Sequence, residues 1–511
     1  MGMNFQQGIT REQLSMLCLD QEIDANSAVR LIDLFVDQLD LSKLAFTKTQ
    51  AAKEGRPPYA AKDMLKLYYY GYLNRVRSSR KLQAECERNI EVWWLINQLK
   101  PCYHTIANFR KDNSAALKKA FKMFVSFLKG EDMFGTELIA IDGTKIRAQN
   151  NKKNNFNEAK IKKHLEYIEG KTEQYIKELE DNDAAEDRQT AELKNKEVAK
   201  KIDTLQQRSK RYEALQQQLH ESKSAQISTV DVDSRSLPLK DGITDVCYNV
   251  QTTGDSKNNL IVEFDTINQG DQGQLHPMAA KAMNILEVKQ ITALTDKGYH
   301  TGKQLQLCKE QSITTLCAYP ERTNKNIDPA YHTDKFMYDA IQDRYTCPQG
   351  AVLTTNGKVY EKTKTGRAAY MVKKYFTMQC KTCLVKHLCT TARGIRLIER
   401  SEYQQAIDEN NKRADENKEL CKKRSPIIEH PYGTIKRGWG YSYTLLKGIK
   451  KVNGEMAIIY TVYNLRRVIS ILGVPELLKR LKQWKPALLI LKTTLLRALF
   501  SSYKNEMCMR A

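Results

Sequence analysis

Two short segments place an aspartate directly after an apolar run, and basic residues and a glycine follow in both. The segment LIAIDGTKIRAQN, residues 138–150, contains Asp142, and the segment ITALTDKGYH, residues 291–300, contains Asp296. Short apolar runs bounded by turn residues are typical of buried strands. We therefore expect Asp142 and Asp296 at the ends of two strands, where carboxylates can act together.

A third acidic group would complete a site for divalent cations. Mg²⁺ prefers oxygen ligands, and two ions about 3.5–4 Å apart can drive an in-line phosphoryl displacement. The downstream segment SPIIEHPYGTIKRGWG supplies Glu429, and Lys436 follows seven residues later. That spacing predicts that Lys436 shares a helix face with Glu429, with Arg437 beside it.

Each of these carboxylates also has a purely structural interpretation. An aspartate at a strand end commonly caps a turn, and a glutamate near a helix start complements the helix dipole. Three in a suitable order favour the chemical interpretation. Asp271, in INQGDQGQLHP, precedes a predicted helix. We interpret Asp271 as an N-cap or as a group behind the metal ligands rather than as a ligand.

Four cysteines lie between Asp296 and Glu429, in the pattern CPQG…CKTCLVKHLC. Four thiolates suit a tetrahedral structural zinc ion, and the CxxC spacing lets one turn supply two ligands. His387 is an alternative fourth ligand. The other interpretation is a cluster of reduced thiols packed in a β-rich insertion. The cysteines are Cys347, Cys380, Cys383 and Cys389.

Charge and length limit the classes of function. Lys and Arg outnumber Asp and Glu by 82 to 60 in 511 residues, which gives a net charge of +22. This excess favours a polyanionic partner, with nucleic acid first, although a merely basic surface would give the same count. The sequence contains no GxxxxGK[ST] loop, so no nucleotide cofactor is indicated. The start MGMNFQQGITREQ lacks a signal-peptide core, and PALLILKTTLLRALF is too short to span a bilayer.

The hydrophobic and charge patterns along the sequence predict a mixed α/β protein with insertions. Apolar spacing predicts an all-helical N-terminal module, and a Lys-, Glu- and Gln-rich tract predicts a helical hairpin. In the module, VRSSRKLQAE and CYHTIANFRK place Ser or Thr at N-cap positions beside Arg, which suits helices that present their first turns to DNA phosphates. Caps for stability beside solvated arginines would give the same pattern. Strand patterns that alternate with helical patterns in the remaining segments predict a mixed α/β sheet. The expected divisions are 1–130 for the helical module, 131–150 and 225–320 for the core, 151–224 for the hairpin insertion, 321–400 for the cysteine-rich insertion, 401–475 for the last core helices and 476–511 for a tail helix.

Four phrases together resemble one family. IAIDGTKIRA, YNVQTTGD, LTDKGYH and IEHPYGTIKR are similar, in the same order, to the catalytic blocks of bacterial insertion-sequence transposases of the DDE class. The helical segment RPPYAAKDMLKLYYYGYLNRVRSSRKL…TIANFRK resembles the N-terminal module of these transposases. Cysteines similar to the four between Asp296 and Glu429 occur in the branch of the family that this chain resembles. The resemblance implies a ribonuclease H-like catalytic core.

The resemblance also implies residue roles. Asp142, Asp296 and Glu429 would bind two Mg²⁺ or Mn²⁺ ions, and Lys436 and Arg424 would match the family's basic residues after and before the glutamate. Three further cations beside the candidate carboxylates are also expected to contact DNA, namely Arg437, Lys145 and Lys297. A related family pattern reads Tyr-x2-Arg-x3-Glu-x6-Lys. This chain has Cys421 at the Tyr position and four residues between Arg424 and Glu429. The role of Arg424 is therefore in doubt, whereas the spacing from Glu429 to Lys436 fits.

The expected function is a DNA transposase that cuts transposon ends and joins the 3′-hydroxyls to target DNA. Its partners would be double-stranded DNA, as terminal inverted repeats and as target, and a second copy of the chain in the DNA complex. No membrane is expected, and the location would be the bacterial cytoplasm at the nucleoid. The alternatives are a DDE-type nuclease without transposition and a zinc-containing DNA-binding regulator without catalysis.

Overall fold

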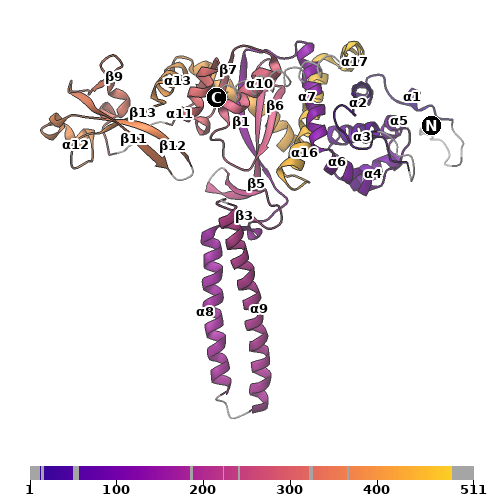
Figure 1. The fold of residues 1–511 in the computed structure, drawn as a ribbon. Helices are drawn as coiled ribbons and strands as arrows, with labels where there is room; N and C mark the ends of the chain where they lie inside the picture. Colours follow the sequence, from indigo (N-terminus) through magenta and orange to yellow (C-terminus); the bar gives the residue numbers. More distant parts are fainter. Residues whose placement is uncertain are drawn as a thin grey trace, which may run out of the picture.

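The fold was analysed in a computed structural model. It describes residue 12 and residues 16–49, 57–183, 188–222, 224–239, 242–320, 326–364 and 367–485. Figure 1 shows a helical region, a central mixed sheet and a second sheet arranged in a row, with a long two-helix arm projecting from the middle. The expected mixed α/β class with a helical N-terminal region is confirmed. The predicted apolar tail at 486–500 lies outside the described residues.

Short helices form the N-terminal region. Two start with side-chain caps, since Ser27 accepts a hydrogen bond from Val29 N and Asn89 accepts hydrogen bonds from Glu91 N and Val92 N. The segment MLKLYYYGYL is buried around its whole circumference, as expected for a central helix. The helices are α1 Leu19–Glu22, α2 Ala28–Asp37, α3 Ala61–Leu73, α4 Ser79–Arg88, α5 Ile90–Leu95, α6 Tyr103–Asp112 and α7 Ser114–Gly130.

The central sheet has six strands. They run in the order β4-β5-β1-β7-β8, with β6 also paired to β5. β1 is parallel to β7, β7 is parallel to β8, and β4, β5 and β6 form the antiparallel part. The strands are β1 Leu138–Arg147, β4 Arg235–Pro238, β5 Thr244–Asp255, β6 Ile261–Ile267, β7 Ile291–Thr295 and β8 Ile313–Cys317.

Helices cover both faces of this sheet. α10 (Leu275–Leu286) packs on β1, β5, β6 and β7. α15 (Arg424–Tyr432) and α16 (Ile449–Leu472) pack on the other face, where Ile427 and Ile428 of α15 contact Ala140 and Leu294. The remaining helices are α11 Gly302–Glu310, α13 Gln404–Glu416, α14 Lys418–Lys422, a π-helix at Gly433–Gly438, and α17 Val474–Gln483.

The N-terminal helices and the central sheet share one hydrophobic core. α16 lies between them, packing on α3 and α7 as well as on β6. The approach to α7 is so close that a Cβ at Gly454 would collide with Ser114. The rings of Phe121 in α7 and Phe264 in β6 lie 5.0 Å apart. The predicted division near residue 130 therefore crosses a continuous core rather than a linker.

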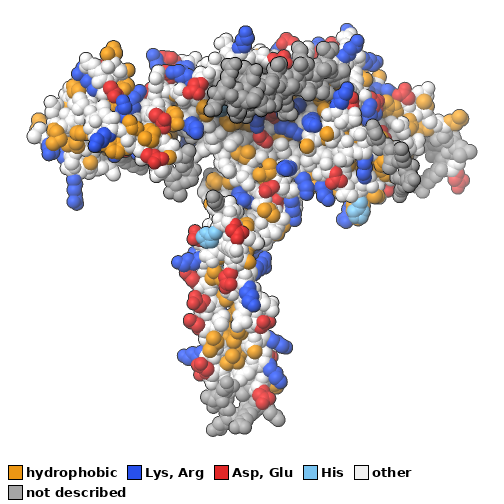
Figure 2. Space-filling view, in the orientation of Figure 1, with side chains coloured by type: hydrophobic (Ala, Val, Ile, Leu, Met, Phe, Trp, Pro, Cys, Tyr) orange, Lys and Arg blue, Asp and Glu red, His pale blue; other side chains and the backbone are white. Residues whose placement is uncertain are grey.

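Two long helices, α8 (Glu158–Asp183) and α9 (Arg188–Glu221), form the arm within the segment expected to be a hairpin. At its base Phe156, Ile161, Leu215 and Leu219 form a small core beside the strand pair β2 (Asn155–Phe156) and β3 (Ile227–Ser228). Figure 2 shows positive and negative side chains interspersed along the arm. The arm is therefore a solvated projection of mixed charge.

A second, five-stranded sheet lies at the opposite end from the N-terminal helices (Figure 1). Its strands run in the order β13-β12-β11-β10-β9, and all pairs are antiparallel. The strands are β9 Met337–Asp339, β10 Arg344–Thr346, β11 Val352–Lys364, β12 Arg367–Phe376 and β13 Ile398–Ser401, and the short helix α12 spans Lys386–Cys389.

Among the described helices, no single one has both the length and the apolar run of a membrane span; α16 and α17, which are bent by 113° at the break between them, have them only when taken together.

Candidate active site

Asp142 and Asp296 lie on neighbouring parallel strands. The last paired residues of β1 and β7 are Ile141 and Thr295, so each aspartate is the next residue along its strand. Asp296 follows β7 directly, as expected, and its carboxylate accepts a hydrogen bond from Lys297 N at 2.7 Å. The register therefore brings the two carboxylates to one place on the sheet.

The prediction that Asp142 ends its strand is wrong. β1 continues to Arg147, because its antiparallel pairing with β5 extends beyond its parallel pairing with β7. Asp142 is paired with Thr252 in the middle of β1. It sits where β7 stops and leaves one side of β1 open, so its neighbourhood still resembles the end of a strand.

The carboxylate of Asp142 is held by groups of opposite charge and by donors. Arg424 of α15 donates a hydrogen bond to Oδ2 at 3.0 Å, and Gly143 N donates to Oδ1 at 2.8 Å. The hydroxyl of Tyr432 donates to the backbone oxygen of Asp142 at 2.7 Å. Two contacts from α15 thus fix Asp142 on the α15 face of the sheet.

Burial raises the pKa of Asp142, while Arg424 and the Gly143 amide act in the opposite direction. The negative charges of Asp271 and Asp296 also raise the pKa of Asp142. A carboxyl group that is destabilised in its charged form by burial and by like charges is typical of functional sites. A cation placed between these groups would relieve the repulsion.

Glu429 occupies the middle of α15 and is exposed. Its neighbours Ile427 and Ile428 face the sheet, and it is Arg424 of the same helix that contacts Asp142. Within the described ranges, no group of three or more His, Cys, Asp or Glu side chains has the geometry to hold a metal ion. The structure therefore brings together the two aspartates, but not the predicted triad.

The cations predicted to bind DNA fall into two groups. Arg424 is paired with Asp142, Lys145 is paired with Asp271 at 3.1 Å, and Lys436 donates to Thr144 Oγ1 and Lys145 O at 3.3 and 3.1 Å. Arg437 and Lys297 are exposed. The α-helical spacing that predicted a shared face for Glu429 and Lys436 ends at Tyr432, where the π-helix begins. π-turns of this kind often occur at functional sites.

Asp271 is not a helix cap. The N-cap of α10 is Gln274, and the Asp271 carboxylate instead accepts hydrogen bonds from Lys145, Asn249 and Gln251. Asn249 and Gln251 are both fully buried in β5. Sequence reasoning missed these two amides. The available signal was YNVQTT itself, in which polar residues alternate along a strand that is otherwise apolar.

The four predicted cysteines line one cavity of about 210 Å³ beside the second sheet. All four are free thiols. Burial raises the pKa of Cys389, and Cys347, Cys380 and Cys383 raise it further. Cys347 Sγ accepts a hydrogen bond from Ala351 N at 3.3 Å in a turn where Gly350 has a φ of 81°. The four cysteines therefore line the same cavity, but within the described residues they do not form a group with the geometry of a metal site.

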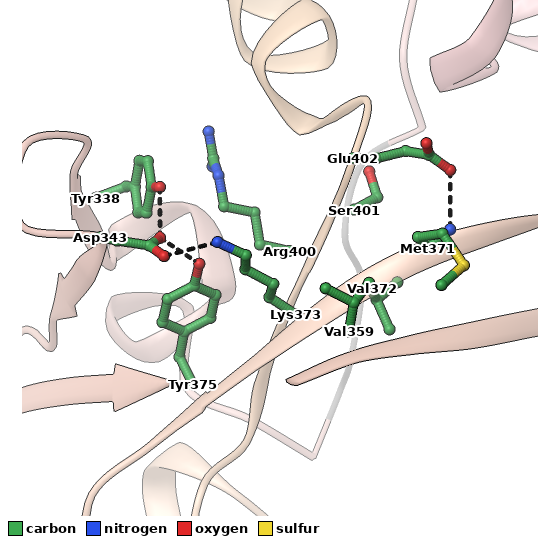
Figure 3. Close-up of a pocket in the computed structure, with 10 residues that line it drawn as sticks. All are labelled: Tyr338, Asp343, Val359, Met371, Val372, Lys373, Tyr375, Arg400, Ser401 and Glu402. Atoms are coloured by element: carbon green, nitrogen blue, oxygen red, sulfur yellow. Dashed lines mark hydrogen bonds and ion pairs between the residues drawn. The ribbon is translucent and has the colours of Figure 1, made fainter. Parts of the chain in front are cut away.

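A second cavity, of about 230 Å³, lies on the same sheet (Figure 3). Its charged groups bond to one another: Asp343 accepts hydrogen bonds from Tyr338, Tyr375 and Lys373, and these bonds lower the pKa of Asp343 to about 2. Arg400 stacks 3.7 Å from the centre of the Tyr338 ring. This network joins strands of the second sheet.

Comparison with protein families gives two matches. Residues 17–112 match a transposase domain (DUF772), and residues 346–469 match a transposase DDE domain. The resemblance to insertion-sequence DDE transposases is therefore confirmed. The second match contains Glu429, Lys436 and the four cysteines, whereas Asp142 and Asp296 lie outside both. No curated protein and no solved structure matches the chain.

Proposed function

We propose that the protein is a transposase that cuts transposon ends and joins the resulting 3′-hydroxyls to target DNA. The observation that carries the proposal is the adjacency of Asp142 and Asp296 on β1 and β7, in a chain with two transposase-domain matches. The strand order, with antiparallel β5 and β6 beside parallel β1, β7 and β8, supports a ribonuclease H-like core.

The residues at this place fit divalent cations. Asp142 and Asp296 offer hard oxygen ligands of the kind that Mg²⁺ and Mn²⁺ prefer. Burial raises the pKa of Asp142, and the negative charges of Asp271 and Asp296 also act to raise it. Glu429 is retained as the third ligand in the proposal, because its helix packs on β1 and lies in the matched DDE domain. Two bound ions would activate the attacking oxygen and stabilise the leaving one.

The chain's own cations would position the DNA. Lys297 follows Asp296 directly, Arg437 lies in the π-helix after Glu429, and both are exposed. Phosphate contacts from such side chains set the register of the substrate without reading its bases. Lys436 ties the π-helix to β1 through Thr144 and Lys145. It would therefore fix the segment that presents Arg437. A homodimer on paired DNA ends, in a bacterial cytoplasm, completes the proposal.

A structural zinc ion is proposed for the cysteine cavity. The donor set fits chemically, because four cysteines line one small space and sets of four sulfur ligands are typical of structural zinc sites. The ion would connect the turn after β10 to the segment before α12. Its role would be to stabilise this end of the molecule, away from the aspartates.

The test is cleavage of DNA. Inverted repeats immediately outside the reading frame would supply the end sequence, and an oligonucleotide carrying it would be incubated with the protein and Mg²⁺. A transposase gives nicked ends and strand-transfer products. A nuclease without transposition gives nicks alone, and a DNA-binding regulator gives a gel shift without cutting. Binding without any cleavage in Mg²⁺ or Mn²⁺ would contradict the proposal.

A further inference from the structure

Asp271 lies on the face of the sheet opposite Asp142. Gly143 and Lys145 of β1 are paired with Gln251 and Asn249 of β5, so all four point to the same face, and Asp271 covers them. The Asp142 side chain points to the other face, toward α15. Asp271 therefore supports this part of β1 from behind.

The carboxylate of Asp271 joins three side chains of β1 and β5. Asn249 Nδ2 and Gln251 Nε2 each donate to Oδ1 at 2.8 Å, and Lys145 Nζ lies 3.1 Å from both oxygens. An ionised carboxylate only accepts hydrogen bonds, so it suits three donors that converge on it. Asp271 is thus suited to holding its neighbours in place.

The contacts of Asp271 reach the chain on both sides of the candidate site. A Cβ at Gly143, next to Asp142, would collide with Asp271 Oδ1, so only glycine admits this contact. Gly298, two residues after Asp296, lies against the Asp271 side chain. Tyr299 then donates to Gln251 Oε1 at 2.6 Å. One polar network therefore spans from the residue after Asp142 to the turn after Asp296.

We infer that Asp271 is a positioning residue that sets the separation and orientation of Asp142 and Asp296. The inference rests on the proposed function. Its physical basis is that Asn249 and Gln251 are fully buried, so losing Asp271 removes the acceptor of two buried amide donors and the counter-charge of Lys145. The two turns would then shift, and small shifts of catalytic groups reduce rates steeply.

The test compares Asp271→Asn and Asp271→Ala with the wild type in single-turnover cleavage and in Mn²⁺ titration without DNA. Asn keeps the shape and one acceptor but cannot pair with Lys145. We expect kcat to fall about tenfold for Asn and about a hundredfold for Ala, with KM for DNA changed less than about twofold. Mn²⁺ affinity should fall in the same order, because the two carboxylates are no longer held together.

Asp255→Asn is the matched control. Asp255 is a fully buried carboxylate at the end of β5, whereas the Asp271 side chain is 26% exposed. Asp255 also holds loop and strand together, but it accepts from the Gly135, Lys257 and Asn258 amides, away from the candidate site. It should lower the melting temperature and leave kcat and Mn²⁺ affinity unchanged. If Asp271→Ala does not fold, Asp271→Asn decides.

The proposed transposase function and the positioning role of Asp271 can fail separately. A wild-type protein that binds no Mn²⁺ and cuts no DNA overturns the proposed function and this inference with it. A wild type that cuts DNA, with folded Asp271 variants that match its kcat and Mn²⁺ affinity, overturns the inference alone.

Discussion

Arg424 donates a hydrogen bond to Asp142 at 3.0 Å, so the side chain that reaches the candidate catalytic aspartate from α15 is a cation rather than Glu429. Both partners are partly buried, with side-chain exposures of 22% and 25%. The pair orients Asp142 from one face while Asp271 supports its strand from the other. Arg424 was the cation whose role the sequence pattern left in doubt, and this contact gives it one.

Removing that contact should impair cleavage. Arg424→Ala is expected to lower the cleavage rate about tenfold, because Asp142 loses the guanidinium that orients it. Arg424→Lys should recover part of the rate, since it keeps the charge but not the planar fork. Single-turnover rates with saturating DNA measure this effect. Wild-type rates for Arg424→Ala would show that the pair is not needed for the reaction.

The contact between the helical region and α16 contains a buried ion pair whose loss should destabilise the protein. Arg77 and Glu455 lie 3.2 Å apart at 8% and 1% side-chain exposure, and Glu455 also accepts from the Leu445 and Leu446 amides. Glu455→Ala leaves Arg77 buried without its counter-ion, which should cost about 3–5 kcal/mol.

Denaturant unfolding measures that loss, with Glu476→Gln as the control. Glu476 forms a more exposed pair with Arg480 in α17, and breaking it should change the free energy of unfolding far less, because solvent screens the pair. Equal effects of the two substitutions would contradict a special role for the buried pair.

The parts predicted best were those set by local pattern. The apolar run before Asp296 and the helical periodicity of the N-terminal region are local signals, and both elements formed where expected. The position of Asp142 within β1 depends on how far β5 extends along it, which is a property of strand pairing rather than of the segment itself.

Other features of the site depend on contacts between distant segments or on geometry that residue types do not encode. Arg424 and Asp142 meet only because α15 packs on β1. The residue types at Gly433–Gly438 do not distinguish a π-helix from an α-helix. The sequence prediction therefore assumed α-helical spacing and placed Lys436 on the same face as Glu429. The amides that hold Asp271 were visible as polar residues in a buried strand, but their partner was not.

Zinc should be present in the purified protein. Elemental analysis is expected to give about one equivalent after purification without chelators, and Cys380→Ser with Cys383→Ser should abolish it and make residues 347–389 sensitive to protease. Cys18→Ser is the control, because Cys18 is exposed and does not line the cysteine cavity. A wild-type protein with less than about half an equivalent would contradict the zinc proposal.

The two cations after Glu429 should act differently. Arg437 is exposed, so Arg437→Ala should weaken binding to end and unrelated DNA by similar factors and reduce the salt slope by about one unit. Lys436 is bonded to β1, so Lys436→Ala should lower cleavage more than binding. Gel shifts at several salt concentrations and cleavage assays on the same preparations separate the two effects. If neither substitution alters either quantity, both side chains lie outside the DNA interface.

The central claim is that Asp142 and Asp296 perform chemistry rather than cap turns. The most direct measurement is cleavage of an end oligonucleotide in Mg²⁺ by Asp142→Asn and Asp296→Asn, alongside Glu429→Gln, with DNA binding measured on the same samples. Each substitution removes an anionic oxygen while keeping the shape of the side chain. The account predicts wild-type binding and no detectable cleavage for all three. Near-wild-type cleavage by either aspartate variant would contradict it.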